Sequence, residues 1–285
     1  MKAPQPRTVR TLALCADDFG LSPGISAGIA SLAWAQRLNA VSCITNSRHW
    51  ESDAPLLRRL PPSVDVGLHI NLTEGQPLSP QLARVWPQLP ALSVLIARAH
   101  LGLLPGVEIR CEIDAQLAAF QSAMGRAPTY VDGHQHVHHL PVLRTIVLDL
   151  VDQLHPRPAV RATARVVGPG FGVKRWLIRH TGGRALAREL RRRALAHNPV
   201  LLGVYDFQQP DYRLLMLGWL AALPAEGGLL FCHPGETAAH EPPDAIGAAR
   251  QRELNYLGSD LFPQDLATAG VRLGNVWHTG APARR

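Results

Sequence analysis

Short apolar runs alternate with longer segments of helical pattern, and this alternation restricts the fold more than any other feature of the sequence. Apolar runs bounded by turn residues are typical of buried strands, and strands that alternate with helices form a parallel sheet covered by helices. Ser22 and Pro23 suit the N-cap and first position of the first helix. The expected strands are 11–16, 41–45, 64–68, 128–132, 160–167, 228–232 and 271–276, and the expected helices are 22–37, 107–125 and 141–154.

Both an open doubly wound sheet and a closed or partly closed barrel satisfy this order of elements. Seven or eight strands in 285 residues favour the barrel. We therefore expect an α/β chain that folds as a distorted TIM-like (β/α) barrel of about seven strands, with residues 1–285 in a single domain. Two segments interrupt the pattern, and we expect both to be inserts: 71–106 is rich in Pro, Leu and Gln, and 168–200 is cationic.

The sequence excludes several classes of protein. No apolar run reaches the roughly 18–20 residues that a membrane span needs. The first apolar stretch, 12–16, is too short for a secretory signal, so we expect a cytoplasmic protein. The four cysteines form no CxxC pair, which excludes a zinc knuckle or a thioredoxin motif and indicates buried, reduced thiols.

The net charge of +7 is concentrated in one segment. Residues 157–193 contain eleven basic residues and a single acidic residue, Glu189, which gives this window a net charge of +10. Aromatic residues are sparse there, Phe171 and Trp176 only, so we expect no nucleic-acid partner. Two interpretations stay open: a solvated covering helix, or a surface attracted to anionic groups such as membrane lipid, a lipid-linked sugar or a phosphorylated glycan.

Polar side chains follow the expected strands at the points where they end. Because the carboxyl ends of parallel strands meet at one face, these distant residues are predicted to converge on one pocket. The residues are Asp17 and Asp18 after the first strand, Asn46 after the second, His69, Asn71 and Thr73 after the third, Asp132 to His139 after the fourth, and His233 to Glu236 after the strand 228–232.

Each group also has a purely structural interpretation. Asp17 and Asp18 could cap the following helix, but Ser22 is better placed to do so, and two adjacent carboxylates need a cation. His69 alone could be a hydrogen-bonded buried histidine. His233 precedes a Pro-Gly turn and could serve as an acid, a base or a structural group.

The histidines at 134, 136, 138 and 139 could be a surface run or an adventitious metal binder. In an extended segment, His134, His136 and His138 would share one face. Strand pitch would place 134 and 138 roughly 13 Å apart, so we expect one or two of the histidines to bind a metal. The others are expected to contact substrate or to orient a ligand.

One carboxylate and two imidazoles form a three-ligand metal site with open positions, as a catalytic metal needs. Such a set suits Zn²⁺, Mn²⁺, Co²⁺, Ni²⁺ or Fe²⁺ and is less suited to Mg²⁺. A coordinated water becomes acidic, a second aspartate can take its proton, and a histidine opposite can protonate a leaving amine. Together these groups predict hydrolysis of an amide.

The ordered motifs resemble those of the YdjC-like carbohydrate deacetylases, which include chitooligosaccharide deacetylases and the hopanoid-associated (HpnK) type. The resemblance rests on Ala-Asp-Asp-Phe-Gly-Leu-Ser at 16–22, Gly-Leu-His-Ile-Asn-Leu-Thr at 67–73, Asp-Gly-His-Gln-His-Val-His at 132–138 and His-Pro at 233–234. It implies a distorted TIM-like barrel and a hydrolase that removes acetyl from an N-acetylated sugar with one divalent ion, zinc, magnesium, manganese or cobalt.

The same resemblance implies roles by motif position. Asp18, His69 and His134 would hold the metal, Asp17 would be the general base and His233 the general acid. Asp132 would orient a ligand imidazole. The remaining candidates for contacts with substrate or with a ligand are Asn46, Asn71, Thr73, His136, His138 and Glu236.

The chain departs from chitooligosaccharide-type members at Gln135, which replaces a histidine, at Glu236, and in the basic character of 168–200. The expected substrate is therefore either a chitooligosaccharide-like sugar or a glycolipid-linked N-acetylglucosamine. The expected partners are this substrate, an anionic membrane through 157–193 and a second copy of the chain in a homodimer. Two alternatives remain: a non-catalytic metal- or sugar-binding protein, and a non-haem iron oxygenase, which also uses two histidines and a carboxylate.

Overall fold

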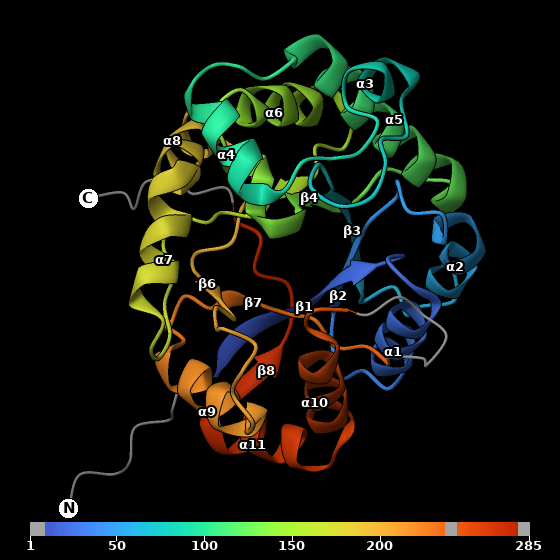
Figure 1. Ribbon diagram of the computed structural model, residues 1–285. Coiled ribbons are helices and arrows are strands. Elements are labelled where there is room, and N and C mark those ends of the chain that lie inside the picture. The colour runs from blue at the N-terminus through green and yellow to red at the C-terminus, as the bar shows by residue number, and fades with distance from the viewer. Residues whose placement is uncertain (1–8, 237–243, 279–285) are drawn as a thin grey trace, which may run out of the picture.

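The structure is a computed structural model that describes residues 9–236 and 244–278 (Figure 1). One sheet contains eight parallel strands in the order β5-β4-β3-β2-β1-β7-β6, and β8 pairs with β1 beside this path. The strands are β1 (Arg10–Phe19), β2 (Ala40–Cys43), β3 (Asp65–Ile70), β4 (Tyr130–Gly133), β5 (Ala159–Val160), β6 (Leu201–Leu202), β7 (Gly228–Cys232) and β8 (Val271–Leu273).

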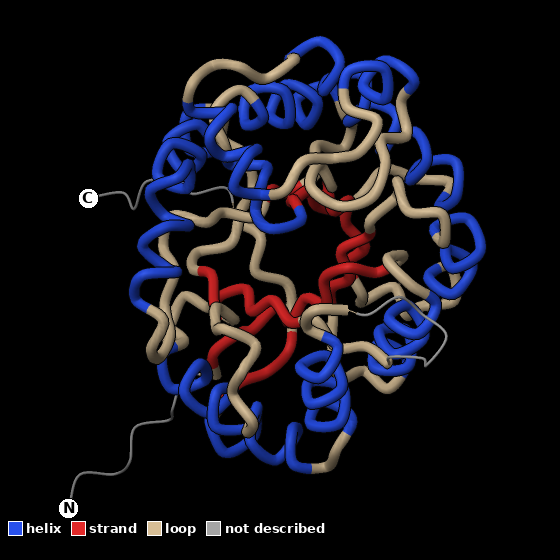
Figure 2. The backbone as a smooth tube through the Cα atoms, in the orientation of Figure 1, coloured by secondary structure: helices blue, strands red, loops and turns tan. Residues whose placement is uncertain are grey.

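The sheet curls into a barrel. Its two edge strands approach each other through isolated parallel bridges, Val160 with His197 and Val166 with Leu201. Figure 2 shows the strands curled in the middle of the molecule with the helices around them. The expectation of an α/β chain with a distorted, TIM-like barrel is therefore confirmed.

Helices cover the outside of the barrel. Ser22 caps α1 by accepting a hydrogen bond from the Ile25 N–H, and Pro23 is the first helical residue, as the sequence predicts. Gly125 and Gly270 end α5 and α11 in the left-handed conformation that glycine adopts most easily. The helices of the barrel are α1 (Pro23–Trp34), α2 (Trp50–Leu57), α5 (Gly106–Met124), α6 (Leu143–Gln153), α9 (Tyr212–Ala222), α10 (Gly247–Gly258) and α11 (Leu261–Ala269).

Further helices form within the two interrupting segments. Residues 71–106 contain α3 (Pro80–Val85) and α4 (Leu92–His100). Residues 168–200 contain α7 (Gly172–Ile178), a π-helical turn η2 (Arg179–Gly183) and α8 (Arg184–Arg192). In the described part of the chain, no helix combines the length and the apolar character that a bilayer span requires.

The strand expected over 160–167 is much shorter than predicted. Regular pairing with β4 ends after the Arg161 N–H, and the side chain of Asn198 bonds the backbone of Ala162, the residue that follows. Its Oδ1 accepts from the Ala162 N–H at 2.7 Å, and its amide donates to the Ala162 carbonyl at 3.1 Å. The two-residue strand β6 and the helices α9, α10 and α11 were not predicted from the sequence.

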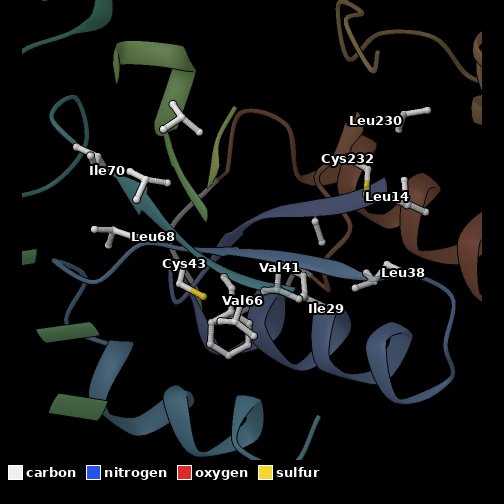
Figure 3. Close-up of a cluster of buried hydrophobic side chains, with 14 of the residues drawn as sticks. Leu14, Ile29, Leu38, Val41, Cys43, Val66, Leu68, Ile70, Leu230 and Cys232 are labelled. Carbon is white, nitrogen blue, oxygen red and sulfur yellow. The ribbon is translucent and has the colours of Figure 1, made fainter. Parts of the chain in front are cut away.

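Alternate side chains of strand β1 point into two different apolar clusters. Leu12, Leu14 and Ala16 pack in the larger cluster between sheet and helices, whereas Ala13 and Cys15 belong to the smaller cluster inside the barrel. Figure 3 shows the larger cluster, in which Leu14 and Val41 lie with Ile29 of α1. Cys15, Cys43 and Cys232 are buried free thiols, and Cys111 is a half-buried one. The inward alternation of β1 continues to Asp17.

Candidate active site

A cavity of about 1150 Å³ lies where the strands end. Its wall brings together predicted site residues from distant parts of the sequence: Asp17, Asp18, His69, His134, His136, His233 and Glu236. The convergence expected for the carboxyl ends of parallel strands is thus observed. The other predicted residues do not line the cavity: Asn46, Asn71, Thr73, Asp132 and His138.

The backbone at the end of β1 explains how two adjacent carboxylates serve one site. Successive side chains of a strand point to opposite faces, yet Asp17 and Asp18 both line the cavity. Asp18 has a φ of 71°, and the register with β2 shifts between Ala16 and Phe19. Aspartate tolerates this left-handed conformation better than most residues, and such local strain is typical of functional sites.

Asp18, His69 and His134 form the centre of the site. The Asp18 Oδ1 atom lies 3.0 Å from His134 Nδ1 and 3.5 Å from His69 Nε2. All three side chains are buried, and one ligand atom of each lies within 4.8 Å of the others. A carboxylate oxygen with two imidazole nitrogens is a donor set for a divalent transition metal, so these residues fit the predicted ion.

Other side chains fix both imidazoles. Asp132 Oδ1 lies 2.6 Å from His69 Nδ1 and accepts from the Ser42 hydroxyl at 2.5 Å. Glu74 lies 3.1 Å from His134 Nε2. A carboxylate on the far nitrogen is the usual support of a metal-binding histidine. Asp132 contacts the ring of His69, and its role in orienting a metal ligand stays a prediction; neither Glu74 nor Ser42 was predicted from the sequence.

The charges of this centre are strongly coupled. Burial lowers the pKa of His69, but Asp132 and Asp17 outweigh it and raise the pKa to about 10. Burial also lowers the pKa of His134, but Asp18 outweighs it and raises the pKa to about 9. Burial raises the Asp18 pKa, yet Arg250 and His134 hold it well below its usual range. Both rings are therefore protonated at pH 7, and metal binding would displace a proton from each.

Arg161 lies at the centre of a second, fully buried cluster. Its guanidinium donates to both oxygens of Asp17 at 2.6 Å and pairs with Asp132 Oδ2 at 2.5 Å. It also donates to Cys15 Sγ at 3.1 Å. Cys15, Asp17 and Asp132 could themselves hold a metal by spacing, but the guanidinium occupies the space between them. Arg161 thus links Asp17 to the carboxylate that orients His69.

One of the eleven basic residues of segment 157–193 lies inside the molecule. The side chain of Arg161 is 0% exposed, so it belongs neither to a solvated helix face nor to an anion-attracting surface. Arg250 was also missed: it donates to Asp18 Oδ2 at 2.8 Å from helix α10, in a region where the sequence predicted no element. Neither arginine carries a local sequence signal, because both depend on contacts between distant segments.

The extended arrangement expected for the histidine run is wrong. Residues 134–139 form a 3₁₀ segment, η1, in which Gln135 and His136 have φ of 53° and 63°. The side chains therefore diverge. His136 lines the cavity edge-on to Phe231, His138 bonds the Arg161 carbonyl at 2.8 Å, and His139 bonds Thr163.

His233 faces the cavity from the end of β7. Its ring packs edge-on against Phe207 and Phe231, and its Nδ1 has no hydrogen-bond partner among the described residues. Burial lowers its pKa to about 4, against the opposing effect of Asp18 and Asp17. Its backbone N–H donates to the buried carboxylate of Glu253 at 2.5 Å. The imidazole is therefore neutral at pH 7.

Asn71 and Thr73 belong to the loop that carries Glu74, and Asn46, from the segment between β2 and α2, contacts this loop. Asn71 Oδ1 accepts from the backbone N–H groups of Thr73 and Glu74, each at 3.1 Å. Its amide donates to the Glu74 carbonyl at 2.7 Å and to Asn46 Oδ1 at 3.1 Å. These contacts set the backbone from which Glu74 reaches His134.

Comparison with known proteins identifies the family. The family model described as YdjC-like protein matches residues 11–268. The chain belongs to the YdjC-like family. Among its relatives, a carbohydrate deacetylase of Mus musculus is 31% identical over 92% of this chain and 92% of the relative. A chitooligosaccharide deacetylase of Serratia marcescens is 33% identical over 93% and 98%.

The fold of this YdjC-like chain also matches a solved structure. A putative cellobiose-phosphate cleavage protein from Enterococcus faecalis V583 superposes with a TM-score of 0.72 at 20% identity. The match covers 94% of this chain and 97% of that protein. The two proteins therefore share the fold over most of both chains.

Proposed function

We propose that this YdjC-like protein is a metal-dependent deacetylase that hydrolyses the acetyl amide of an N-acetylated sugar. The observation that carries the proposal is the arrangement of three ligand atoms from Asp18, His69 and His134 within 4.8 Å, with Asp17 beside them in the same cavity. The names of the relatives, carbohydrate deacetylase and chitooligosaccharide deacetylase, support the same activity.

The metal would bind to Asp18, His69 and His134, with Asp132 and Glu74 orienting the two rings. When bound, a divalent ion would acidify a coordinated water and polarise the acetyl carbonyl. The donor set supports zinc, manganese or cobalt over magnesium, because imidazole nitrogen suits the softer ions.

Asp17 would act as the general base. Arg161 holds both of its oxygens in place, so that proton transfer needs no reorientation of the carboxylate. His233 would protonate the leaving nitrogen. Because its imidazole is neutral at pH 7, His233 would first accept the proton that Asp17 removes from water and would then pass it to the leaving nitrogen.

The cavity wall supports a substrate with an apolar portion. Around the polar centre the lining includes aliphatic side chains from or beside helices α1, α4, α7 and α10, together with the aromatic rings of Tyr205, Phe207 and Phe231. The aliphatic residues are Leu21 and Ile25, Leu92 and Ile96, Leu177 and Ile178, and Ile246. A free oligosaccharide offers little to such a surface, whereas a lipid tail would cover it. Of the two expected substrates, the wall therefore favours a glycolipid-linked N-acetylglucosamine.

Release of acetate tests the reaction. The protein is stripped of metal, reloaded with Zn²⁺, Mn²⁺, Co²⁺ or Mg²⁺, and given N-acetylglucosamine, chitooligosaccharides and an N-acetylglucosaminyl lipid. We expect metal-dependent acetate release that falls at least 100-fold in Asp17→Asn, which should still bind one metal ion. His134→Ala should lose both metal and activity. One bound metal without acetate release from any substrate would instead support a metal-binding protein.

A further inference from the structure

A second groove, of about 910 Å³, lies on the α7–α8 side of the molecule. It is separate from the catalytic cavity, and no residue lines both. Its described wall contains no acidic residue and six arginines: Arg165, Arg175, Arg179, Arg184, Arg188 and Arg191. We name this surface the arginine groove.

Most of these charges lack an acidic partner. Arg165 pairs with Glu226 at 2.6 Å, and Arg175 donates to the Gly168 carbonyl. No ion pair with an acidic side chain is found, within residues 9–236 and 244–278, for the other four: Arg179, Arg184, Arg188 and Arg191. By contrast, basic residues of the same segment outside the groove are neutralised internally, such as Arg161 by Asp17 and Arg193 by Asp149 and Asp152.

The spacing of these arginines is unfavourable for an isolated helix. Arg184, Arg188 and Arg191 share one face of α8, and the opposite face buries Leu186 and Leu190. Arg175 and Arg179 repeat the four-residue spacing across the end of α7. Like charges at this spacing repel each other, so this set is most stable when an anion lies against it.

Exposed apolar side chains adjoin the groove. Trp176 lines it and is 57% exposed, while Val173 and Leu177 on the same helix are 76% and 47% exposed. Helix α7 lies between the catalytic cavity and the arginine groove: Leu177 and Ile178 line the cavity, and Arg175 and Trp176 line the groove. An exposed tryptophan and aliphatic groups beside unpaired arginines are typical of a membrane-surface helix.

We propose that the α7–α8 face docks on a bilayer that contains anionic phospholipids, with lipid phosphates in the arginine groove and Val173 and Trp176 in the headgroup region. Charge complementarity identifies the partner: a row of unpaired guanidinium groups suits many phosphates at once. The docked orientation brings Leu177, at the rim of the catalytic cavity, close to the lipid surface. The proposal does not depend on the reaction proposed above.

Co-sedimentation tests the docking with the full chain. We expect binding to phosphatidylglycerol vesicles at low ionic strength, no binding to phosphatidylcholine vesicles, and release at high salt. Trp176 should report insertion by a blue shift of fluorescence that Trp176→Phe removes. Inorganic phosphate and soluble hexametaphosphate serve as competitors, which separates a lipid surface from a soluble phosphate site.

A triple variant, Arg184→Gln/Arg188→Gln/Arg191→Gln, should lower the partition to anionic vesicles on the order of 100-fold, at about fivefold for each charge. The matched control is Arg58→Gln/Arg59→Gln/Arg126→Gln, which removes the same charge from exposed positions. Arg58 follows α2, across the molecule from α7 (Figure 1). The control should bind vesicles almost as well as the wild type.

Equal binding of both triple variants would overturn the proposal, since net charge and not this face would then attract the protein. Binding of soluble phosphates without binding of vesicles would overturn it as well. If the protein deacetylates soluble sugars but does not bind anionic vesicles, the docking proposal is wrong and the proposed reaction stands. If it binds vesicles through the groove but releases no acetate, the docking proposal stands and the proposed reaction is wrong.

Discussion

Arg161 shows how much one side chain controls at this site. It is buried between the proposed base, Asp17, and Asp132, which contacts the ring of His69, a proposed metal ligand. Burial lowers its pKa, but Asp132 and Asp17 outweigh that effect and raise it well above the usual value, so the guanidinium stays charged. Its removal leaves two buried carboxylates without their cation. One residue therefore supports the fold and the chemistry together.

We expect Arg161→Gln to lower the free energy of unfolding by about 3–5 kcal/mol, the usual effect of breaking a buried ion pair. Arg161→Lys keeps the charge but loses the two-pronged contact with Asp17, so it should recover more stability than activity. Urea unfolding and acetate release measure the two effects. Arg165→Gln, at an exposed pair with Glu226, is the control and should change little. Full activity of Arg161→Lys would contradict the positioning role.

Glu74 is a second test at the level of single residues. It is 51% exposed, so its replacement should leave the fold intact, but it holds His134 Nε2. Glu74→Gln should weaken metal binding 10- to 100-fold, as removal of such supporting carboxylates typically does. Titration calorimetry with Zn²⁺ measures the change. Glu51→Gln, an exposed acidic residue on α2, is the matched control, and an unchanged Kd in Glu74→Gln would exclude the supporting role.

Among the elements, those with strong local patterns were predicted well and those fixed by distant contacts were not. The strand before Asp17 and the helix after Ser22 follow from apolar runs and capping residues. The histidine run and the end of β5 depend on a left-handed turn at Gln135 and on the side chain of Asn198, which pattern alone does not reveal. The residues of the proposed metal site were found because they lie at or just after the carboxyl ends of strands, whereas their partners on helices and loops, such as Arg250 and Glu74, were not.

The link between α10 and β7 leads to a prediction about pH. Glu253 on α10 accepts from the His233 N–H and from the Tyr205 hydroxyl. Burial nevertheless raises its pKa to about 7, above the value of about 4.5 for the unfolded chain. A raised carboxyl pKa stabilises the fold below pH 4.5, and this contribution disappears as the pH rises through 7.

Glu253→Gln should therefore flatten the pH dependence of unfolding between pH 5 and pH 8. Over this range, the free energy of unfolding of the variant should rise relative to that of the wild type by at most about 3 kcal/mol. Urea unfolding at several pH values measures the two slopes, and Glu108→Gln at the start of α5 serves as the control. Parallel slopes for wild type and Glu253→Gln would show that Glu253 is ionised throughout.

At the scale of the whole molecule, the proposed metal ligands come from β1, β3 and the segment after β4, so metal binding would join distant parts of the barrel. Without an ion, the charges of these three buried side chains act on one another. One divalent ion would coordinate all three at once. A ligand that binds only the folded state at 100 times its Kd stabilises that state by about 2.7 kcal/mol.

For a chain of this size, such stabilisation should raise the Tm by roughly 4–5 °C. Calorimetry of the stripped protein with and without Zn²⁺ measures the shift, and Asp18→Asn should abolish it while Asp17→Asn should keep it. The contrast is informative because the two residues are adjacent and both buried, so general disruption would affect them alike. Loss of the shift in both variants would mean that Asp17 also binds the metal, and the base would then have to be sought elsewhere in the cavity.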